Sequence, residues 1–405
     1  MPVLLQINSV VNSGSTGHIV ENLGKIAIQN GWKSYVAYGR TCRETESRVI
    51  KIGSKLGIYY HVFLTRFLDL HGFGSYFASK KLIKKIKAIN PDIIHLHNIH
   101  GYYINIKVLF SYLKKTEIPV IWTLHDCWAF TGHCSYYTFA GCNNWETSCK
   151  NCPQMNAYPS SFIDNSFWNY KQKKHIFTGL NKLTLVTPSS WLAAQVKKSF
   201  LRNYPVQIIN NGIDLNVFRP YKDVSERIKE LSKNKNIILG VASVWERRKG
   251  LEDFIGLAKL IDSKEYIFVL IGLQKQQINK LPQNIIGIER TENQIELAEW
   301  YSSAFVFFNP SIEETQGLTT IESLACGTPA IVYNSTAVPE ALDEYSGFIV
   351  SPHNIQEVID CIDKIKKTGR FTYVENCRRR ALEYYNRDDK FKEYFKLYVN
   401  KHGGM

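Results

Sequence analysis

The feature that most constrains this chain is a five-residue apolar run, Ala304–Phe308, followed at once by a polar loop. The run is too short for a helix and predicts a buried parallel strand, which Asn309-Pro310 ends. A short helix is expected to begin near Gly317 or Leu318 and to stop at Gly327, because glycine favours the position after a helix end. The loop between strand and helix should lie at the carboxyl edge of a parallel sheet, where α/β sheets bind ligands.

This loop and the start of its helix carry candidate ligand-binding groups. Glu314 lies in the loop, and Glu322 lies about one turn inside the expected helix. The free amides of Gln316, Gly317, Leu318 and Thr319 open the helix and offer an anion site. Carboxylates accept hydrogen bonds from hydroxyls while amides hold a diphosphate, so the spacing suits a sugar-nucleotide. Two solvated glutamates beside an ordinary helix are the alternative.

The same stretch resembles the signature of the retaining glycosyltransferases of family 4. The resemblance is carried by Glu314 and Glu322, with seven residues between them, and by the following Ser-Leu-Ala-Cys-Gly-Thr-Pro at 323–329. It implies the two-domain GT-B fold, with Glu314 facing the transferred sugar as a catalytic group and Glu322 holding the ribose. The amides of residues 316–319 would contact sugar and diphosphate. Gln316 departs from the pattern, since the family usually has an aromatic residue there.

The chain of 405 residues is long enough for two domains, each with its own core. We expect two Rossmann-like, doubly wound α/β domains facing a cleft. The acceptor-side domain would comprise residues 1–205 and a C-terminal helix at about 386–405, and the nucleotide-sugar domain residues 206–385. Strands are expected at 3–9, 33–40, 91–98, 119–126 and from 183 onward, then at 237–243, 266–272, 285–289, 304–308, 330–333 and 347–350.

A glycine-bearing turn, Asn12–His18, separates the first expected strand from a helical pattern over 19–29. Glycine at such a turn lets backbone amides approach a phosphate closely. A tight turn that needs glycine only for its geometry is the alternative. The family resemblance implies that Gly14 and Gly17 form a loop facing the donor phosphate and the acceptor.

Histidines end two of the expected strands. His125 resembles the family's cleft histidine, which touches the transferred sugar, and Asp126 beside it would set its tautomer or the loop geometry. His95 and His97 lie on one side of their strand, so a metal pair is conceivable, although strand-end histidines usually form local hydrogen bonds.

Basic residues follow the first strand of the second domain. Arg248 and Lys249 stand at a strand-to-helix turn where cations can meet a diphosphate leaving group; a solvated basic turn is the alternative. Either Arg247 or Arg248 would replace the arginine that the family carries slightly earlier. The sequence contains no Asp-x-Asp motif, so we expect amides and these cations, without a catalytic metal, to neutralise the leaving group.

A cysteine-rich insertion at 134–152 follows His125. Cys134, Cys142, Cys149 and Cys152 fall within nineteen residues and close with Cys-x-x-Cys, which predicts a structural zinc site, with His133 as a substitute ligand. Two disulfides or a redox pair are the alternatives. Some relatives of family 4 carry a similar insertion, which implies a structural role.

Residues 51–90 combine aromatic and basic side chains. Leu82, Ile83, Ile86 and Ile89 make one helical face and lysines make another. This pattern is typical of a helix that covers a sheet. It also fits a peripheral contact with an anionic membrane, with aromatic groups at the interface and lysines over headgroups.

Composition limits the function classes. The sequence has no apolar stretch of about 18 residues and no secretory signal, so we expect a cytoplasmic protein. The net charge of +14 predicts an anionic partner. We predict a retaining hexosyl- or related transferase that moves a sugar from a nucleotide-sugar to a glycan acceptor, lipid-linked, in surface polysaccharide synthesis. A sugar-nucleotide isomerase (epimerase) of the same fold is one rival. A nucleic-acid binder is the other; no reading module supports it, so we expect no nucleic-acid partner.

Overall fold

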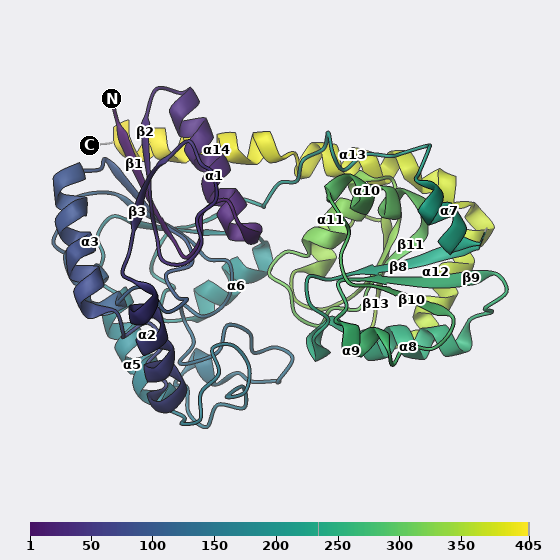
Figure 1. The fold of residues 1–405 in the computed structure, drawn as a ribbon, viewed down its shortest axis with the longest axis horizontal. Helices are drawn as coiled ribbons and strands as arrows, with labels where there is room; N and C mark the ends of the chain where they lie inside the picture. Colours follow the sequence, from purple (N-terminus) through teal and green to yellow (C-terminus); the bar gives the residue numbers. More distant parts are fainter. Residues whose placement is uncertain (234, 404–405) are drawn as a thin grey trace. The chain divides into compact units, whose positions relative to one another are not determined.

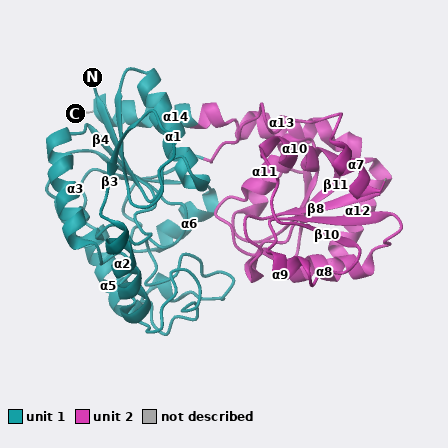
Figure 2. Ribbon diagram, viewed as in Figure 1, with its two compact units in different colours: residues 1–209, 391–405 teal, residues 210–390 magenta. Residues whose placement is uncertain are grey.

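The computed structural model describes residues 1–233 and 235–403. It separates into unit 1, residues 1–209 with 391–405, and unit 2, residues 210–390, a few residues from the boundaries expected from the sequence (Figure 2). Each unit contains its own parallel sheet covered by helices (Figure 1). The expected fold class, two Rossmann-like α/β domains, is confirmed.

Unit 1 is built on a seven-stranded parallel sheet in the order β3-β2-β1-β4-β5-β6-β7. Its strands are β1 Val3–Asn8, β2 Lys33–Tyr38, β3 Arg48–Lys51, β4 Ile93–Leu96, β5 Val120–Thr123, β6 Leu183–Thr187 and β7 Val206–Ile208. Strands β3 and β7 were not predicted from the sequence. Both are short edge strands with exposed residues, so neither shows the continuous apolar run of a strand covered on both faces.

Helices cover the unit 1 sheet: α1 Gly14–Gln29, α2 Lys55–Leu68, α3 Tyr76–Ile89, α4 Ile106–Leu113, α5 Ser166–Phe177, α6 Ser190–Lys198 and the end of α14 Arg387–Gly403. Tyr394 and Tyr398 of α14 pack in one core cluster with Leu4 and Ile93, so the end of the chain belongs to this unit. Within the described residues, no helix is both long enough and apolar enough to cross a bilayer.

Unit 2 has a six-stranded parallel sheet in the order β10-β9-β8-β11-β12-β13. Its strands are β8 Asn236–Val241, β9 Tyr266–Ile271, β10 Ile285–Ile288, β11 Ala304–Asn309, β12 Ala330–Tyr333 and β13 Gly347–Val350. The main helices are α7 Glu226–Ser232, α8 Leu251–Leu260, α9 Lys275–Ile278, α10 Gln294–Ser303, α11 Leu318–Ala325, α12 Ile355–Thr368 and α13 Val374–Tyr384. In β9, Val269 joins the core on one face while Phe268 and Leu270 join that on the other, which explains the uninterrupted apolar run.

The strand order places the ligand-binding edge of each sheet. In unit 1 the order reverses between β1 and β4, and in unit 2 between β8 and β11. Open α/β sheets bind ligands beyond the carboxyl ends of the strands at this switch point. The β8–α8 turn and the β11–α11 loop flank the switch point of unit 2, so the candidate donor residues share one edge.

Candidate active site

The β11–α11 loop ends in a helix start suited to an anion. Gly317 precedes α11 with φ 75° and ψ 53°, a left-handed conformation that glycine adopts without strain. Leu318 is the first helical residue, as predicted. Among the described residues, the amides of Gly317, Leu318 and Thr319 donate no hydrogen bond. These amides and the positive end of the helix dipole can therefore hold a phosphate.

Glu314 and Lys249 meet at the switch point. The Glu314 carboxylate forms an ion pair with Lys249 Nζ, and their side chains are 17% and 13% exposed. Lys249 ends the short 3₁₀ helix η2, Arg247–Lys249, which follows β8. The Glu314 amide donates to Thr336 Oγ1 at 3.0 Å, which fixes the loop. The structure thus brings the predicted sugar-facing acid and diphosphate-facing cation together in one pair.

Arg248 ties the two loops of the site together. Its Nη1 donates to the carbonyl oxygen of Glu313 at 2.9 Å, and its Nε forms an ion pair with Glu246 at 3.0 Å. Arg247 is exposed to solvent on the same turn. Of the two arginines, Arg248 is the one that the structure positions at the loop carrying Glu314.

Gly250 permits the close approach of the β8–α8 turn to the β11–α11 loop. It has φ 73°, and a Cβ there would lie 2.5 Å from the carbonyl oxygen of Pro310. Any other residue would push the two segments apart. The position after Lys249 therefore requires glycine for packing.

Glu322 is half-buried inside α11 and has a partner that the sequence analysis missed. The Tyr301 hydroxyl, from α10, donates to Glu322 Oε2 at 3.0 Å. Burial raises the pKa of the Glu322 carboxyl to about 7. No spacing signal links these residues, because their contact depends on how α10 packs against α11.

Gln316 anchors the loop through its side chain. Its Oε1 accepts from the Asn211 amide at 2.8 Å, and its Nε2 donates to the Asn211 carbonyl oxygen at 3.0 Å. The residue is 5% exposed. A two-point hydrogen bond here replaces the packing of the aromatic residue that the family usually carries.

The glycine turn of unit 1 requires a correction. Helix α1 begins at Gly14, so most of the expected loop Asn12–His18 is the first turn of this helix. Gly17 is buried within it, where a Cβ would lie 3.1 Å from Val10 Cγ2 and 3.2 Å from the Asn12 amide nitrogen. Gly17 is therefore needed for close packing, and Gly14 stands at the helix start.

A chain of hydrogen bonds sets the tautomer of His125. Gln6 Nε2 donates to the Val20 carbonyl oxygen at 2.9 Å, so Gln6 Oε1 is the atom 3.2 Å from His97 Nε2. Because Oε1 only accepts, His97 is protonated on Nε2 and accepts through Nδ1, which lies 3.3 Å from His125 Nε2. His125 thus carries its proton on Nε2. Burial lowers its pKa to about 4, so it is neutral at pH 7.

The other groups near His125 have local partners. Asp126 Oδ2 lies 2.9 Å from His100 Nε2, and Oδ1 accepts from the Trp128 amide at 2.9 Å. Asp126 therefore sets the loop geometry, and His97 sets the tautomer of His125. His95 contacts the Tyr398 and Thr123 hydroxyls at 2.7 and 2.8 Å. With both ring nitrogens engaged in this way, His95 does not form a metal pair with His97.

The four clustered cysteines and His133 line one cavity of about 10 Å³. All nine cysteines are free thiols. The Cys134 thiol donates to Cys152, which lowers the pKa of Cys152 to about 7, and the Gly132 amide donates to Cys149 Sγ at 3.1 Å. Among the described residues, no three ligand-type side chains stand close enough to share a metal ion. The cysteines are gathered as predicted, and the zinc itself stays a prediction.

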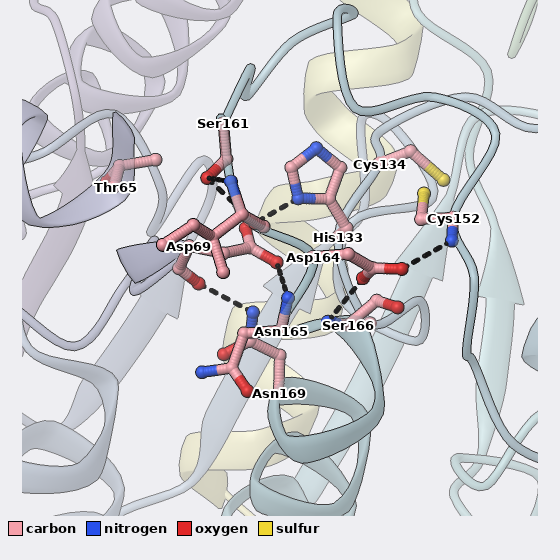
Figure 3. Close-up of polar contacts among 12 residues, drawn as sticks. Thr65, Asp69, His133, Cys134, Cys152, Ser161, Asp164, Asn165, Ser166 and Asn169 are labelled. Carbon is pink, nitrogen blue, oxygen red and sulfur yellow. Dashed lines mark hydrogen bonds and ion pairs between the residues drawn. The ribbon is translucent and has the colours of Figure 1, made fainter. Parts of the chain in front are cut away.

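His133 is oriented by a buried carboxylate (Figure 3). Its Nδ1 lies 2.6 Å from Asp69 Oδ1, and both side chains are 0% exposed. Asp69 also accepts from the Asn165 amide at 3.0 Å, and Asn169 donates to the Asp69 carbonyl oxygen at 2.6 Å. His133 Nε2 has no hydrogen-bond partner among the described residues. A carboxylate behind an imidazole is typical of metal-binding histidines, so His133 has the orientation of such a ligand.

Family comparisons agree with this geometry. Residues 16–217 match the model for Glycosyltransferase Family 4, and residues 222–387 match the model for Glycosyl transferases group 1. The chain is a family 4-like glycosyltransferase with the GT-B fold. The group 1 match contains the predicted donor-binding residues from Arg248 to Glu322.

Relatives of this glycosyltransferase act in polysaccharide and lipid synthesis, by their names. It is 24% identical over 412 residues to the putative colanic acid biosynthesis glycosyl transferase WcaC of Escherichia coli, covering 98% of this chain and 99% of that protein. It is 25% identical over 228 residues to the processive diacylglycerol alpha-glucosyltransferase of Acholeplasma laidlawii, covering 52% of this chain and 67% of that protein.

Solved structures share the fold of the glycosyltransferase. Sucrose-phosphate synthase from Thermosynechococcus elongatus superposes with a TM-score of 0.71 at 17% identity, over 100% of both chains. Anabaena HepE, in complex with UDP and glucose, superposes with a TM-score of 0.68 at 14% identity, over 97% of this chain and 98% of that one. At these identities the similarity concerns the fold.

Proposed function

We propose that this glycosyltransferase transfers a sugar, with retained configuration, from a nucleotide-sugar to a lipid-linked glycan in surface polysaccharide synthesis. The observation that carries the proposal is the convergence of the Glu314–Lys249 pair, the open amides of α11 and the half-buried Glu322 at one sheet edge. Glu322 accepts hydrogen bonds from the ribose hydroxyls, and Glu314 positions the transferred sugar.

The diphosphate is the group whose charge must be stabilised during transfer. As the sugar departs, negative charge grows on the leaving phosphate, next to the amides of residues 317–319 and the Lys249 ammonium. Fixed donors of this kind need no reorganisation at the moment of reaction. Arg248 donates to the Glu313 carbonyl oxygen and so holds the β8–α8 turn next to the β11–α11 loop.

The second proposed catalytic group is His125 of unit 1. The imidazole is neutral because burial lowers its pKa to about 4, and its proton lies on Nε2, toward His97. A neutral imidazole positions the sugar without adding a charge near the developing positive carbon.

Three comparisons support the choice of substrates. The Anabaena HepE structures contain UDP or UDP-glucose, which supports a nucleotide-sugar donor. Two relatives from Acholeplasma laidlawii are named for glucosyl transfer to diacylglycerol lipids, which supports a lipid acceptor. The similarity to WcaC supports a role in a surface polysaccharide.

One surface of unit 1 has the composition of a peripheral membrane-binding surface, and we place it at the cytoplasmic face of the membrane. Helix α2 exposes a run of large apolar side chains: Leu56, Tyr59, Tyr60, Phe63, Phe67 and Leu68. Helix α3 exposes Lys80, Lys81, Lys84, Lys85 and Lys87. Aromatic groups favour the membrane interface and lysines favour anionic headgroups, so this face is proposed to contact the membrane peripherally.

The two acids test the donor site. Glu322→Ala should weaken nucleotide-sugar binding by about tenfold or more, because it removes a ribose acceptor. Glu314→Ala should lower kcat by about a hundredfold with a smaller effect on binding, because its partner lies nearer the reacting carbon. Binding is measured by thermal shift across a panel of nucleotide-sugars, and transfer with a lipid-linked glycan.

Equal and small effects from both variants would place these acids outside the site. The exposed Glu230→Gln is a suitable control. Conversion of the donor to an isomer without any acceptor would identify a sugar-nucleotide isomerase instead.

A further inference from the structure

A groove between α2 and α3 lies apart from the residues proposed to bind the donor. Its volume is about 750 Å³, within the range of about 300–1,000 Å³ typical of small-molecule sites. One wall comes from α2, with Ile58 and Leu64, and the other from α3, with Ala78 and Leu82. Tyr103, fully buried, closes it. An interior of this kind favours a hydrocarbon over a sugar or a nucleotide.

The rim of the groove is unusually apolar for a surface. Of the fourteen residues of α2, only His61 and Thr65 are fully buried. Tyr60 and Phe77, which line the groove, are 61% and 77% exposed. Contiguous exposed apolar groups mark interaction sites. Here they lead from the groove to the face proposed to contact the membrane, so a chain could pass from bilayer to groove without crossing water.

Two lysines give the mouth of the groove its charge. Lys81 and Lys85 of α3 line it and are exposed, and neither forms an ion pair within the described part of the chain. Lys51 also lines it, but its Nζ already donates to the carbonyl oxygens of Gly39 and Arg40, each at 2.7 Å. Lys81 and Lys85 are therefore the cations available to an anion.

Within the described residues, no acidic side chain lines the groove. Asp69 is the sole acidic residue in the sequence from 51 to 90, and its carboxylate is buried against His133. An anionic group at the mouth would thus meet positive charge without repulsion, while an apolar tail would enter the groove. This charge distribution matches a phosphate joined to a hydrocarbon chain.

We propose that the groove binds the hydrocarbon segment nearest the phosphate of the lipid acceptor, and that Lys81 and Lys85 bind that phosphate. This inference rests on the proposed lipid-linked acceptor and names where unit 1 holds it. The remainder of a long chain stays in the bilayer. The site selects acceptors by their lipid carrier, independently of the glycan.

Filling the groove is the first test. Gly57 of α2 lines it, and a Cβ there would meet only Ser54 Oγ at 3.6 Å, an ordinary contact. Gly57→Phe should weaken binding of farnesyl diphosphate to the full chain by about tenfold, because the ring occupies the space of the isoprenyl units. Gly256→Phe is the matched control, since Gly256 is a helical glycine of α8 with open space around it. It should leave binding unchanged.

Removing charge is the second test, and it does not depend on packing. The double variant Lys81→Gln/Lys85→Gln should also weaken farnesyl diphosphate binding by about tenfold. Lys84→Gln/Lys87→Gln removes the same charge from the same helix outside the groove and should change it by less than about twofold. Inorganic diphosphate and farnesol alone should each bind more weakly than the joined molecule.

Several results would overturn the proposal. Unchanged binding in Gly57→Phe and in Lys81→Gln/Lys85→Gln would place the lipid elsewhere. If inorganic diphosphate bound as tightly as farnesyl diphosphate, the hydrocarbon chain of the lipid would have no role in binding. A dimer that farnesyl diphosphate dissociates would show that a second copy covers the groove. Nucleotide-sugar binding, measured on the same variants, should not change; its absence in the wild type would contradict the proposed function instead.

Discussion

Two glutamates eight positions apart have different surroundings. Glu314 is paired with Lys249 beside the switch point, so its charge is compensated and close to the proposed sugar. Glu322 lies one turn into α11, where burial raises its pKa to about 7 and Tyr301 is its one hydrogen-bond partner among the described residues. The first acid is suited to electrostatics in a charged site, and the second to neutral hydrogen bonding with hydroxyls.

The raised pKa of Glu322 predicts a pH-dependent stability. The folded state holds the proton up to about pH 7, whereas an unfolded glutamate releases it near its usual value of about 4.3. The folded state binds more protons between these values, so this residue's contribution to stability falls as pH rises through that window. Glu322→Gln should abolish the loss and leave the variant more stable than wild type at pH 8, by about 1–3 kcal/mol.

Denaturant unfolding of both proteins, at a series of pH values from 5 to 8, checks this prediction. The series covers pH values below and above the Glu322 pKa of about 7. The gain from Glu322→Gln should be small at pH 5 and full at pH 8. The exposed Glu230→Gln should show no such trend. A gain of the same size at every pH would mean that the carboxyl titrates normally in the folded protein.

At the scale of elements, the cysteine-rich segment is the least regular part of unit 1. Between β5 and α5 it contains a single 3₁₀ helix, η1 Asn144–Glu146, among the described residues. Trp145 packs with Phe130 and Tyr137 in an aromatic cluster. These aromatic residues belong to the main core cluster of unit 1. The Asp69–His133 pair connects the segment to the end of α2. A long segment with so little regular structure is commonly also stabilised by a metal or a covalent link.

The zinc prediction belongs to this segment. Freshly purified, reduced protein should carry about one zinc per chain, and Cys149→Ser should lose it and lower the melting temperature of unit 1. His133→Gln should lose it too if Nε2 is a ligand. Cys42→Ser, which changes a thiol outside the cavity, should retain the metal. Elemental analysis that finds no zinc in the reduced wild type would contradict the site.

At the scale of the whole molecule, charge is unevenly distributed. The chain has a net charge of +14, and the segment from 51 to 90 holds many lysines with one buried acid. Each lysine near an anionic surface contributes roughly 1 kcal/mol, so the five lysines of α3 can hold the protein reversibly. Exposed aromatic residues of α2 add an apolar contribution that salt does not screen.

Vesicle sedimentation checks this attachment. Wild type should pellet with anionic vesicles, not with neutral ones, and high salt should release most of it because the Debye length falls to about 3 Å at 1 M. The variant with Lys80, Lys81, Lys84, Lys85 and Lys87 changed to glutamine should stay in the supernatant yet bind nucleotide-sugar normally. The control changes five exposed lysines of unit 2 to glutamine, and it should pellet as wild type does: Lys259, Lys264, Lys275, Lys280 and Lys367.

If the wild-type protein does not pellet with anionic vesicles, α3 only covers the sheet. Pelleting lost equally in both variants would show that net charge matters and that its location does not.

The fold was predictable where the sequence has a clear pattern of apolar residues. Strands such as β9 and β11 are covered on both faces, so each appears as an unbroken apolar run. Edge strands β3 and β7 were missed because they are short and partly exposed. Helix α1 starts at Gly14, earlier than predicted. Glycines in a sequence favour a loop, whereas Gly17 is a helical residue whose position has no room for a larger side chain.

The two parallel sheets, the loop from Glu314 to Glu322 and the proximity of the cysteines were predictable from the sequence, because these depend on neighbours in the chain. The contacts of Tyr301 with Glu322 and of His97 with His125, and the groove between α2 and α3, became visible only in the folded structure. Those contacts join residues on separate elements. Their geometry follows from how helices and strands pack, which local periodicity does not encode.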